Sequence, residues 1–166
     1  LSRAGVRVIL VRRGSGPLPA ALSGNGVTLS AGDGGLLHRA DTGFTVRPKV
    51  LDTLLDGGFL PVLEGGEEEA VAQATRAHRL VLFTTQEPSL ALGVDRQVEL
   101  LHLDLARAAE LRKAGELPPE TNRALEVACR AVEGGVRRAA LLAPGADHIL
   151  LLDALGQHIQ GISVTP

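Results

Sequence analysis

The feature that most constrains the fold of this chain is a series of short, almost uninterrupted aliphatic runs. The four clearest runs are Val6–Val11, Phe59–Leu63, Leu80–Thr84 and Val136–Ala143. None of them shows the strict apolar–polar alternation of a strand with one solvated face. Segments with helical spacing separate the runs, so each run is expected to be a strand that is buried on both faces. The pattern predicts an α/β protein, a three-layer α/β/α sandwich with a mostly parallel central sheet.

Proline, glycine and capping residues mark where the expected helices begin and end. The best-marked helix begins at Pro48 and ends at the Gly57-Gly58 pair. Asp104 is the expected N-cap of a later helix, and Gly115 is expected to end that helix. We also expect helices over 17–22, 67–77, 118–133 and 146–155, and short strands over 27–30, 36–38, 42–46, 98–103 and 162–164.

Composition excludes several functional classes. Of the 166 residues, 45% are hydrophobic and 22% are charged, and the formal net charge is -2, as in one ordinary soluble domain. No apolar run approaches the ~20 residues of a membrane-spanning helix, so no membrane partner is expected. The single cysteine, Cys129, is expected to be a small buried thiol in a cytoplasmic protein. Three phenylalanines are the only aromatic residues, and together with the slight negative charge they argue against a nucleic-acid partner.

The turn after the first aliphatic run is the first candidate binding site. It contains Arg12, Arg13, Gly14, Ser15 and Gly16. Backbone N–H groups of a glycine turn at the start of a helix bind phosphate or carboxylate, and arginine strengthens such a site. The turn matches neither the phosphate-binding loop G-x-x-x-x-G-K-[ST] nor the dinucleotide fingerprint G-x-G-x-x-G. The alternative is an ordinary solvated turn.

The remaining polar groups have ordinary structural explanations. Asp33 lies in the glycine-rich turn Ala31–Gly35, which is expected to join the strands 27–30 and 36–38 as a hairpin. Glu67–Glu69 stand at an expected helix start, where carboxylates complement the helix dipole. The five histidines are not spaced as zinc ligands, and no metal site is expected. The residues alone identify no catalytic group.

Four segments, in order along the chain, carry a resemblance to a known family. Ser30–Leu37 resembles the pattern L-S-G-x-D-G-x-L, and Thr42–Leu63 is similar to T-G-x-V followed by N-P-x-x-L-x-x-L-L-x-x-G-[YF]-[IL]-P-V-[IL]. Leu80–Leu90 resembles L-V-x-L-T-D-V-P-G-L, and Ala131–Arg138 resembles A-x-x-G-G-V-x-R. These are patterns of the N-acetylglutamate kinases and the related aminoadipate-carrier kinases, which are members of the amino-acid kinase family.

The resemblance implies a fold and a chemistry. Members of this family are α/β/α sandwiches that transfer the γ-phosphoryl group of ATP, with Mg²⁺, to a carboxylate in arginine or lysine biosynthesis. By this resemblance, Arg12–Gly16 would hold the phosphoryl group or the carboxylate, and Thr84, Thr85 and Pro88 would border the nucleotide. The expected ligands are a small amino-acid derivative or a nucleotide, and a homodimer is implied.

The chain also departs from the family pattern where the family has its catalytic residues. The opening K-x-G-G has no counterpart, and the H-G-G loop falls on 12–15. The N-x-x-D segment maps near 64–68, which contains neither Asn nor Asp, and T-D reads Thr84-Thr85. G-G-M-x-x-K maps on 114–119, with proline or glutamate where the second catalytic lysine belongs.

Two hypotheses follow from the resemblance and the departures. The first is a carboxylate kinase with degraded or incomplete catalytic residues. The second is a kinase-like domain without turnover, which senses a ligand or stabilises a partner. Because the sequence begins with Leu1, we expect one amino-acid kinase-like domain over 1–166 that lacks its N-terminal strand and loop. The substitutions inside continuous segments favour degeneration.

Overall fold

The computed structural model describes residues 6–12, 24–30, 36–40, 43–65, 67–85, 101–143, 153 and 161–166. Internal contacts divide the chain into two compact units, Leu1–Thr75 (unit 1) and Arg76–Pro166 (unit 2). Each unit combines a sheet that contains parallel strand pairs with two helices, which confirms the α/β class. The expectation of a single domain over 1–166 stays a prediction.

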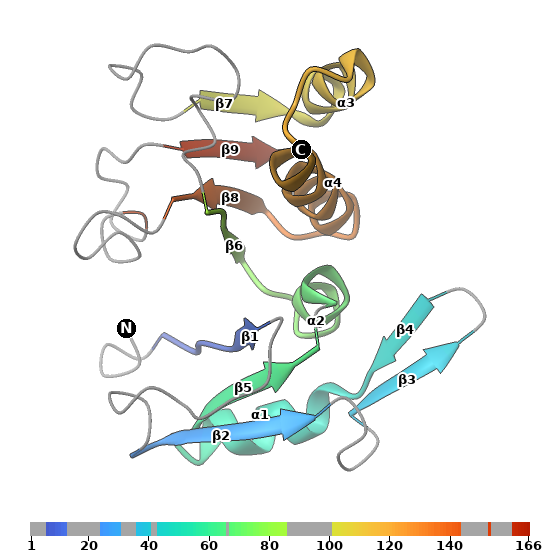
Figure 1. The fold of residues 1–166 in the computed structure, drawn as a ribbon. Helices are drawn as coiled ribbons and strands as arrows, with labels where there is room; N and C mark the ends of the chain where they lie inside the picture. Colours follow the sequence, from blue (N-terminus) through green and yellow to red (C-terminus); the bar gives the residue numbers. More distant parts are fainter. Residues whose placement is uncertain are drawn as a thin grey trace. The chain divides into compact units, whose positions relative to one another are not determined.

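Unit 1 contains a fully parallel sheet in the strand order β1-β5-β2 (Figure 1). These strands are β1 (Leu10–Arg12), β5 (Leu60–Glu64) and β2 (Gly26–Ser30). The central strand β5 pairs in parallel with both neighbours, which confirms the expectation for the run Phe59–Leu63. Only the end of the run Val6–Val11 forms β1, since the strand begins at Leu10.

The expected hairpin between the strands at 27–30 and 36–38 is wrong. The structure pairs β3 (Leu37–Ala40) antiparallel with β4 (Gly43–Val46) instead. All five residues of β2 pair in parallel with β5, and the partner of β3 is the strand that directly follows it. The turn 31–35 lies outside the described residues. Glycine-rich turn signals mark a change of chain direction but do not specify which strands pair.

Two helices complete unit 1, and both follow from local signals. The helix α1 (Pro48–Asp56) has proline in its first turn and ends before Gly57, as expected. The helix α2 (Glu68–Ala74) begins with two carboxylates, which complement the helix dipole. Side chains from both helices and from the sheet form one core cluster, which contains Leu36, Val46, Leu51, Leu63 and Val71.

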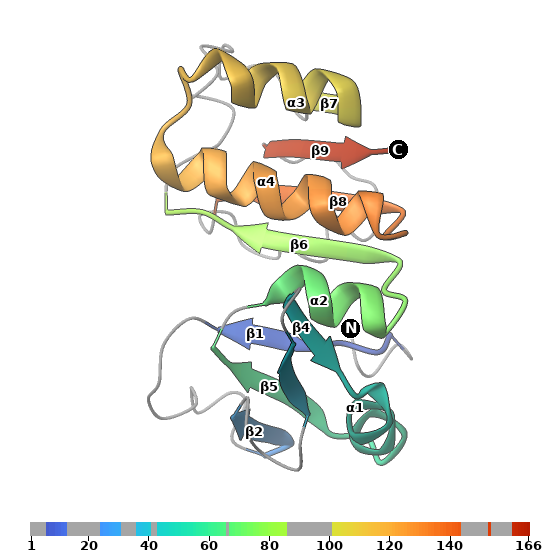
Figure 2. The same ribbon diagram turned by 90° about the vertical axis from the view of Figure 1, so that its right-hand side faces the viewer.

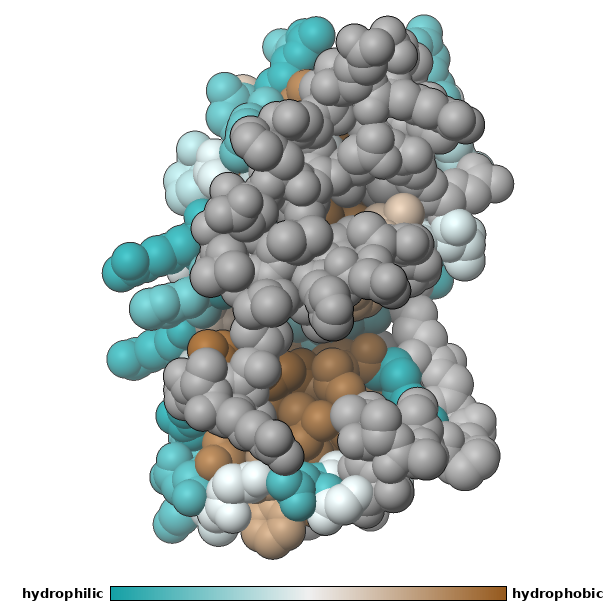
Figure 3. All heavy atoms as spheres, turned by 90° about the vertical axis from the view of Figure 1, so that its left-hand side faces the viewer, coloured by the Kyte–Doolittle hydropathy of each residue, from teal (hydrophilic) through white to brown (hydrophobic). Residues whose placement is uncertain are grey.

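Apolar and polar residues are also separated on the surface of unit 1. Figure 3 shows hydrophobic side chains of unit 1 gathered in the lower half of the view, with hydrophilic side chains along part of the edge of that area. Within the residues that the structure describes, no helix has both the length and the apolar character needed to cross a membrane.

Unit 2 contains a mixed sheet in the strand order β6-β8-β9-β7. The strands are β6 (Arg79–Phe83), β7 (Leu101–Asp104), β8 (Arg138–Leu142) and β9 (Gly161–Thr165). The pairs β6–β8 and β7–β9 are parallel, whereas β8 and β9 are antiparallel. The run Val136–Ala143, which was expected to be a strand of a mostly parallel sheet, is therefore parallel to one neighbour and antiparallel to the other. A continuous aliphatic run predicts burial on both faces, but it carries no information on the direction of the next strand.

The helices α3 (Leu105–Ala114) and α4 (Pro119–Glu133) pack on the sheet of unit 2 (Figure 2). The Asp104 side chain accepts a hydrogen bond of 2.7 Å from the Arg107 backbone N–H, which confirms the expected N-cap. Gly115 ends α3 in the left-handed conformation with φ 72°. Leu125 and Ala128, both 0% exposed, bring the apolar face of α4 into the core. Of the helix expected over 146–155, only Asp153 is described, and the helix expected over 17–22 lies outside the described residues.

Candidate functional site

The three parallel strands of unit 1 end side by side in one row of residues. Arg12, Glu64 and Ser30 are the last residues of β1, β5 and β2, and Glu64 lies opposite both of the others in the sheet register. In open parallel sheets, ligands bind beyond the carboxyl ends of the strands. We call this row the strand-end edge of unit 1 and treat it as one candidate ligand site.

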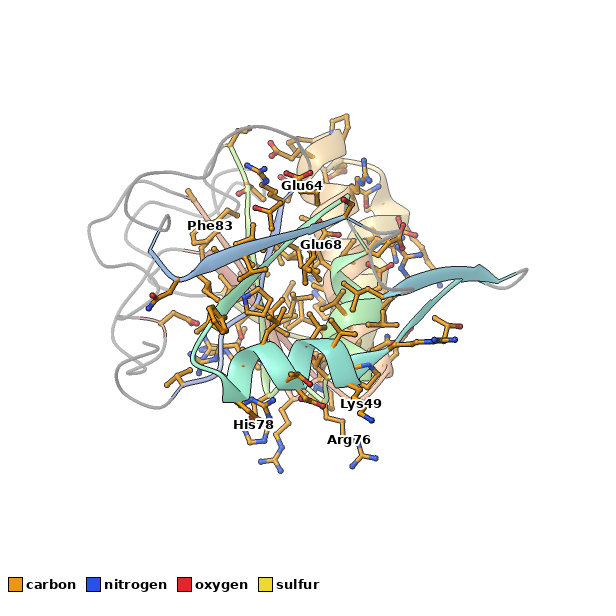
Figure 4. All side chains as sticks on the ribbon, turned by 90° about the horizontal axis from the view of Figure 1, so that it is seen from below. Lys49, Glu64, Glu68, Arg76, His78 and Phe83 are labelled. Atoms are coloured by element: carbon orange, nitrogen blue, oxygen red, sulfur yellow. The ribbon has the colours of Figure 1, made fainter. Side chains whose placement is uncertain are left out.

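An ion pair occupies this edge. Arg12 Nη2 donates a hydrogen bond to Glu64 Oε1. The side chains of Arg12 and Glu64 are only 26% and 24% exposed. Figure 4 shows Glu64 and Glu68 near the end of β5, whereas Lys49 extends away from them on α1. Partial burial reduces the screening of this pair by solvent, so its electrostatic effect on a ligand is stronger than that of a surface pair.

Backbone geometry fixes the strand ends relative to each other. The Gly65 N–H donates a hydrogen bond of 3.0 Å to the carbonyl oxygen of Arg12, directly after the ion pair. Gly65 has φ 136°, a conformation that favours glycine, and Glu67 follows with φ 73° before α2 begins. This sharp turn carries the chain from β5 into α2 within a few residues.

The anion site predicted at residues 12–16 is only partly within the described residues. Arg12 lies at the strand end, as expected, but Arg13, Gly14, Ser15 and Gly16 are outside the described part of the chain. Anion binding at this turn stays a prediction. Sequence reasoning placed Glu64 near a family motif but missed its pairing with Arg12, because the two residues lie 52 positions apart and only the sheet register brings them together.

In unit 2, the residues predicted to border a nucleotide lie just beyond the end of β6. Thr84 is 2% exposed, and its N–H donates a hydrogen bond of 3.0 Å to the Leu142 carbonyl oxygen. Thr85 is exposed and contacts the first turn of α4. Its N–H donates to Glu120 Oε1 at 2.9 Å and its hydroxyl donates to Glu120 Oε2 at 2.5 Å. Pro88 is outside the described residues.

Glu120 brings a carboxylate to this second edge. A carboxylate in the first turn is favoured by the helix dipole, so the structural explanation of Glu120 is sound. Phosphoryl transfer, however, needs cations around the moving phosphoryl group. The resemblance placed a catalytic lysine close to this helix start, where proline or glutamate stands. The Thr85 contact places the Glu120 carboxylate next to the segment on which the resemblance maps that lysine.

A third polar cluster lies at the opposite end of the same sheet. Asp153 is 1% exposed and accepts hydrogen bonds of 2.9 Å from both Arg79 and Arg138. Arg79 also donates to the Asp153 carbonyl oxygen at 2.6 Å, and Arg138 donates to the Ser163 hydroxyl at 2.9 Å. The cluster joins β6, β8 and β9 to a residue of the intervening chain. These contacts indicate that the cluster has a structural role, because Asp153 acts as a clamp that holds β6 and β8 together. No sequence signal identified the cluster.

The described residues contain no group of three His, Cys, Asp or Glu side chains that could hold a metal ion. Cys129 is buried, and burial raises the pKa of its thiol, an effect that the nearby Arg112 opposes. A neutral buried thiol fits the structural interpretation of this residue rather than a nucleophile.

Several proteins of known name are similar to this chain. No protein-family model matches it. It is 29% identical to the acetylglutamate kinase of Synechococcus sp. strain JA-2-3B'a(2-13), over 86% of this chain and 54% of that protein. It is 28% identical to the acetylglutamate kinase of Caldanaerobacter subterraneus subsp. tengcongensis, over 80% of this chain and 53% of that protein. The chain thus spans about half the length of the curated relatives it matches.

Solved structures are similar in fold. N-acetylglutamate synthase from Neisseria gonorrhoeae, complexed with coenzyme A and L-arginine, gives a TM-score of 0.58 at 25% identity over 74% of this chain and 32% of that chain. Carbamate kinase from Giardia lamblia, bound to AMP-PNP, gives a TM-score of 0.53 at 15% identity over 78% of this chain and 51% of that chain.

The fold is that of an α/β protein with the amino-acid kinase architecture. The chain is similar in sequence to acetylglutamate kinases, which confirms the resemblance found in its sequence.

Proposed function

We propose that this chain is an acetylglutamate kinase-like protein that retains ligand binding but has lost efficient phosphoryl transfer. The acceptor class would be the carboxylate of an amino-acid derivative, and ATP with Mg²⁺ would be the phosphoryl donor. The observation that carries the proposal is the Glu120 carboxylate at the start of α4, bound to both Thr85 donors. Loss of one transition-state donor typically costs about 2.7–4 kcal/mol of barrier, and by the resemblance the position of the second catalytic lysine, within 114–119, holds proline or glutamate.

Turnover by the full chain tests this proposal directly. ADP release is measured with ATP, Mg²⁺ and either N-acetylglutamate or an aminoadipate derivative, and compared with a control that contains ATP alone. We expect no release above the control. Turnover on the order of 1–100 per second, the ordinary range for kinases, would overturn the proposal.

A charge substitution tests the role assigned to Glu120. Glu120→Lys replaces the carboxylate with a cation, and we expect tighter binding of ATP in calorimetric titrations, by about tenfold or more. Glu133→Lys is the matched control, because it makes the same charge change at the exposed opposite end of the same helix. Equal ATP affinities in both variants would show that Glu120 does not govern this edge.

A second candidate function is ligand sensing or stabilisation of a partner protein without any turnover. One comparison favours it: the synthase structure that resembles this chain at 25% identity is a complex with coenzyme A and L-arginine. Under this proposal, the protein would bind a small amino acid without converting it. We also propose, from the resemblance, that the protein is a homodimer in the cytoplasm. Sedimentation of the purified chain tests whether it is a dimer.

A further inference from the structure

Basic residues gather where the strands β6 and β8 begin. Arg79 and Arg138 are the first residues of these two parallel strands and lie opposite each other in the sheet register. His78 and Arg137 directly precede them, and Arg76 stands at the start of unit 2. Figure 2 shows the start of β6 and the turn from α4 into β8 at the same end of unit 2. We call these residues together the basic end of unit 2.

The two inner arginines of the basic end already have a partner. The two carboxylate oxygens of Asp153 accept hydrogen bonds of 2.9 Å, one from Arg79 and one from Arg138. Like charges directly opposite each other destabilise a sheet, so Asp153 explains how this pair of arginines is tolerated. The Asp153 carboxylate thereby takes the place that a single small anion would occupy between the two guanidinium groups.

The three outer side chains are free for an external partner. Arg76, His78 and Arg137 are exposed, and within the described residues no hydrogen bond or ion pair holds them. The backbone beside them is fixed, because the N–H of Val136, which is 1% exposed, donates a hydrogen bond of 3.0 Å to the Ala131 carbonyl oxygen. A partner at this end therefore meets charged groups that are anchored on a rigid turn.

Positive charge is in excess at the basic end. The closest carboxylate in sequence is the exposed Glu133, which ends α4, whereas Asp104 lies two strands away from β8 and caps α3. Glu133 and Asp153 together balance two of the four arginines, so two positive charges keep no counter-charge among the described residues. The chain as a whole carries a net charge of -2. A local excess of one sign attracts partners of the opposite sign.

We propose that the basic end of unit 2 docks a carboxylate-rich segment of a partner protein. The outer side chains come from two separate segments and surround an occupied centre, so an extended chain with several carboxylates can reach them in turn. Stacking of nucleic-acid bases lacks a platform here, because Phe83, the only phenylalanine of unit 2, ends β6 at the opposite end of the strand. The inference goes beyond the proposed function, since Thr85 and Glu120 also lie at that opposite end.

The test measures binding of a fluorescent peptide of alternating glutamate and glycine to the full chain by anisotropy. The matched peptide has glutamine in place of glutamate. We expect the glutamate peptide to bind at least about tenfold more tightly, and its affinity should fall as salt rises, because exposed charges are screened. Arg76→Gln combined with Arg137→Gln should weaken the binding of the glutamate peptide by about three- to tenfold, since two exposed ion pairs are lost.

The control variant combines Lys113→Gln with Arg123→Gln. It removes the same charge from exposed positions of α3 and α4 near the connection between these helices, and it should leave the affinity nearly unchanged. An absence of binding, equal binding of the two peptides, or an equal loss in the control variant would overturn the inference. So would tighter binding of a single-stranded oligonucleotide of equal charge, or displacement of the peptide by inorganic phosphate at equal concentration. These results are independent of the turnover assay, so the inference can fail while the proposed loss of phosphoryl transfer stands.

Discussion

At the scale of single residues, the described part of the chain contains a few charged groups that are held by specific partners at buried or partly buried positions. Asp153 is the clearest case, because it is a carboxylate with 1% exposure that is shared by two arginines. Breaking a buried ion pair by removing one partner leaves the other charges uncompensated. The clamp therefore predicts a large dependence of stability on this one side chain.

We expect Asp153→Ala to lower the free energy of unfolding by about 3–5 kcal/mol, because both arginines lose their carboxylate partner. Urea unfolding followed by circular dichroism measures the change. Arg107→Ala is the control, since it breaks an exposed ion pair with Glu110 and should cost less than about 1 kcal/mol. A small and equal effect of both substitutions would contradict the assignment of Asp153 as a clamp.

Cys129 gives a prediction on pH. Burial raises the pKa of its thiol above the ordinary value of 9.0, so the folded state favours the neutral form. Its contribution to stability is fully present below that ordinary value and is lost as pH rises through the folded-state pKa. As pH rises from mildly alkaline values to values above 9.0, we expect the free energy of unfolding of the unaltered chain to fall more than that of Cys129→Ala. Urea unfolding at several pH values measures both. Parallel pH profiles for the two proteins would contradict this.

At the scale of secondary-structure elements, helix boundaries were predictable and strand partners were not. The Pro48 start of α1, the Asp104 cap and the Gly115 stop of α3 all depend on residues within one turn of the boundary. The strand β3 pairs with the strand that directly follows it, whereas the reversal between β8 and β9 depends on contacts between residues that are distant in the sequence. Local signals do not encode such contacts.

Gly161 is the element-scale test of the antiparallel pair β8–β9. A Cβ atom at this position would lie 2.4 Å from the Leu141 carbonyl oxygen and 2.8 Å from a methyl carbon of Leu142. We expect Gly161→Ala to destabilise the protein by about 1–3 kcal/mol through overpacking, as measured by thermal unfolding. Gly24→Ala is the control, because a Cβ there would meet nothing within 4 Å. Equal melting temperatures for both variants would refute the close approach.

At the scale of the whole molecule, the described residues form two separate hydrophobic clusters, one in each unit. Leu51 belongs to the cluster of unit 1 and Leu125 to that of unit 2, and both are 0% exposed. Truncation of a buried leucine costs about 2–5 kcal/mol. How far this loss spreads depends on whether the two units unfold together.

We expect Leu51→Ala to reduce hydrogen-exchange protection in β5 more than in β8, because the substitution removes contacts only from the cluster of unit 1. Leu125→Ala should give the reverse pattern. Hydrogen exchange followed by mass spectrometry measures both. Equal loss of protection in the two units would instead indicate one cooperative domain over 1–166.

The sequence by itself determined the α/β class, the positions of most helices and strands, and the relationship to the acetylglutamate kinases. These depend on burial, periodicity and turn residues, which act over a few neighbouring positions. Only the tertiary structure decided that Arg12 meets Glu64, that Thr85 meets Glu120 and that Asp153 bridges two arginines. Each of these contacts joins residues that are distant in the sequence, and the physical reason they form is the sheet register and the helix packing, which fix positions that no local pattern specifies.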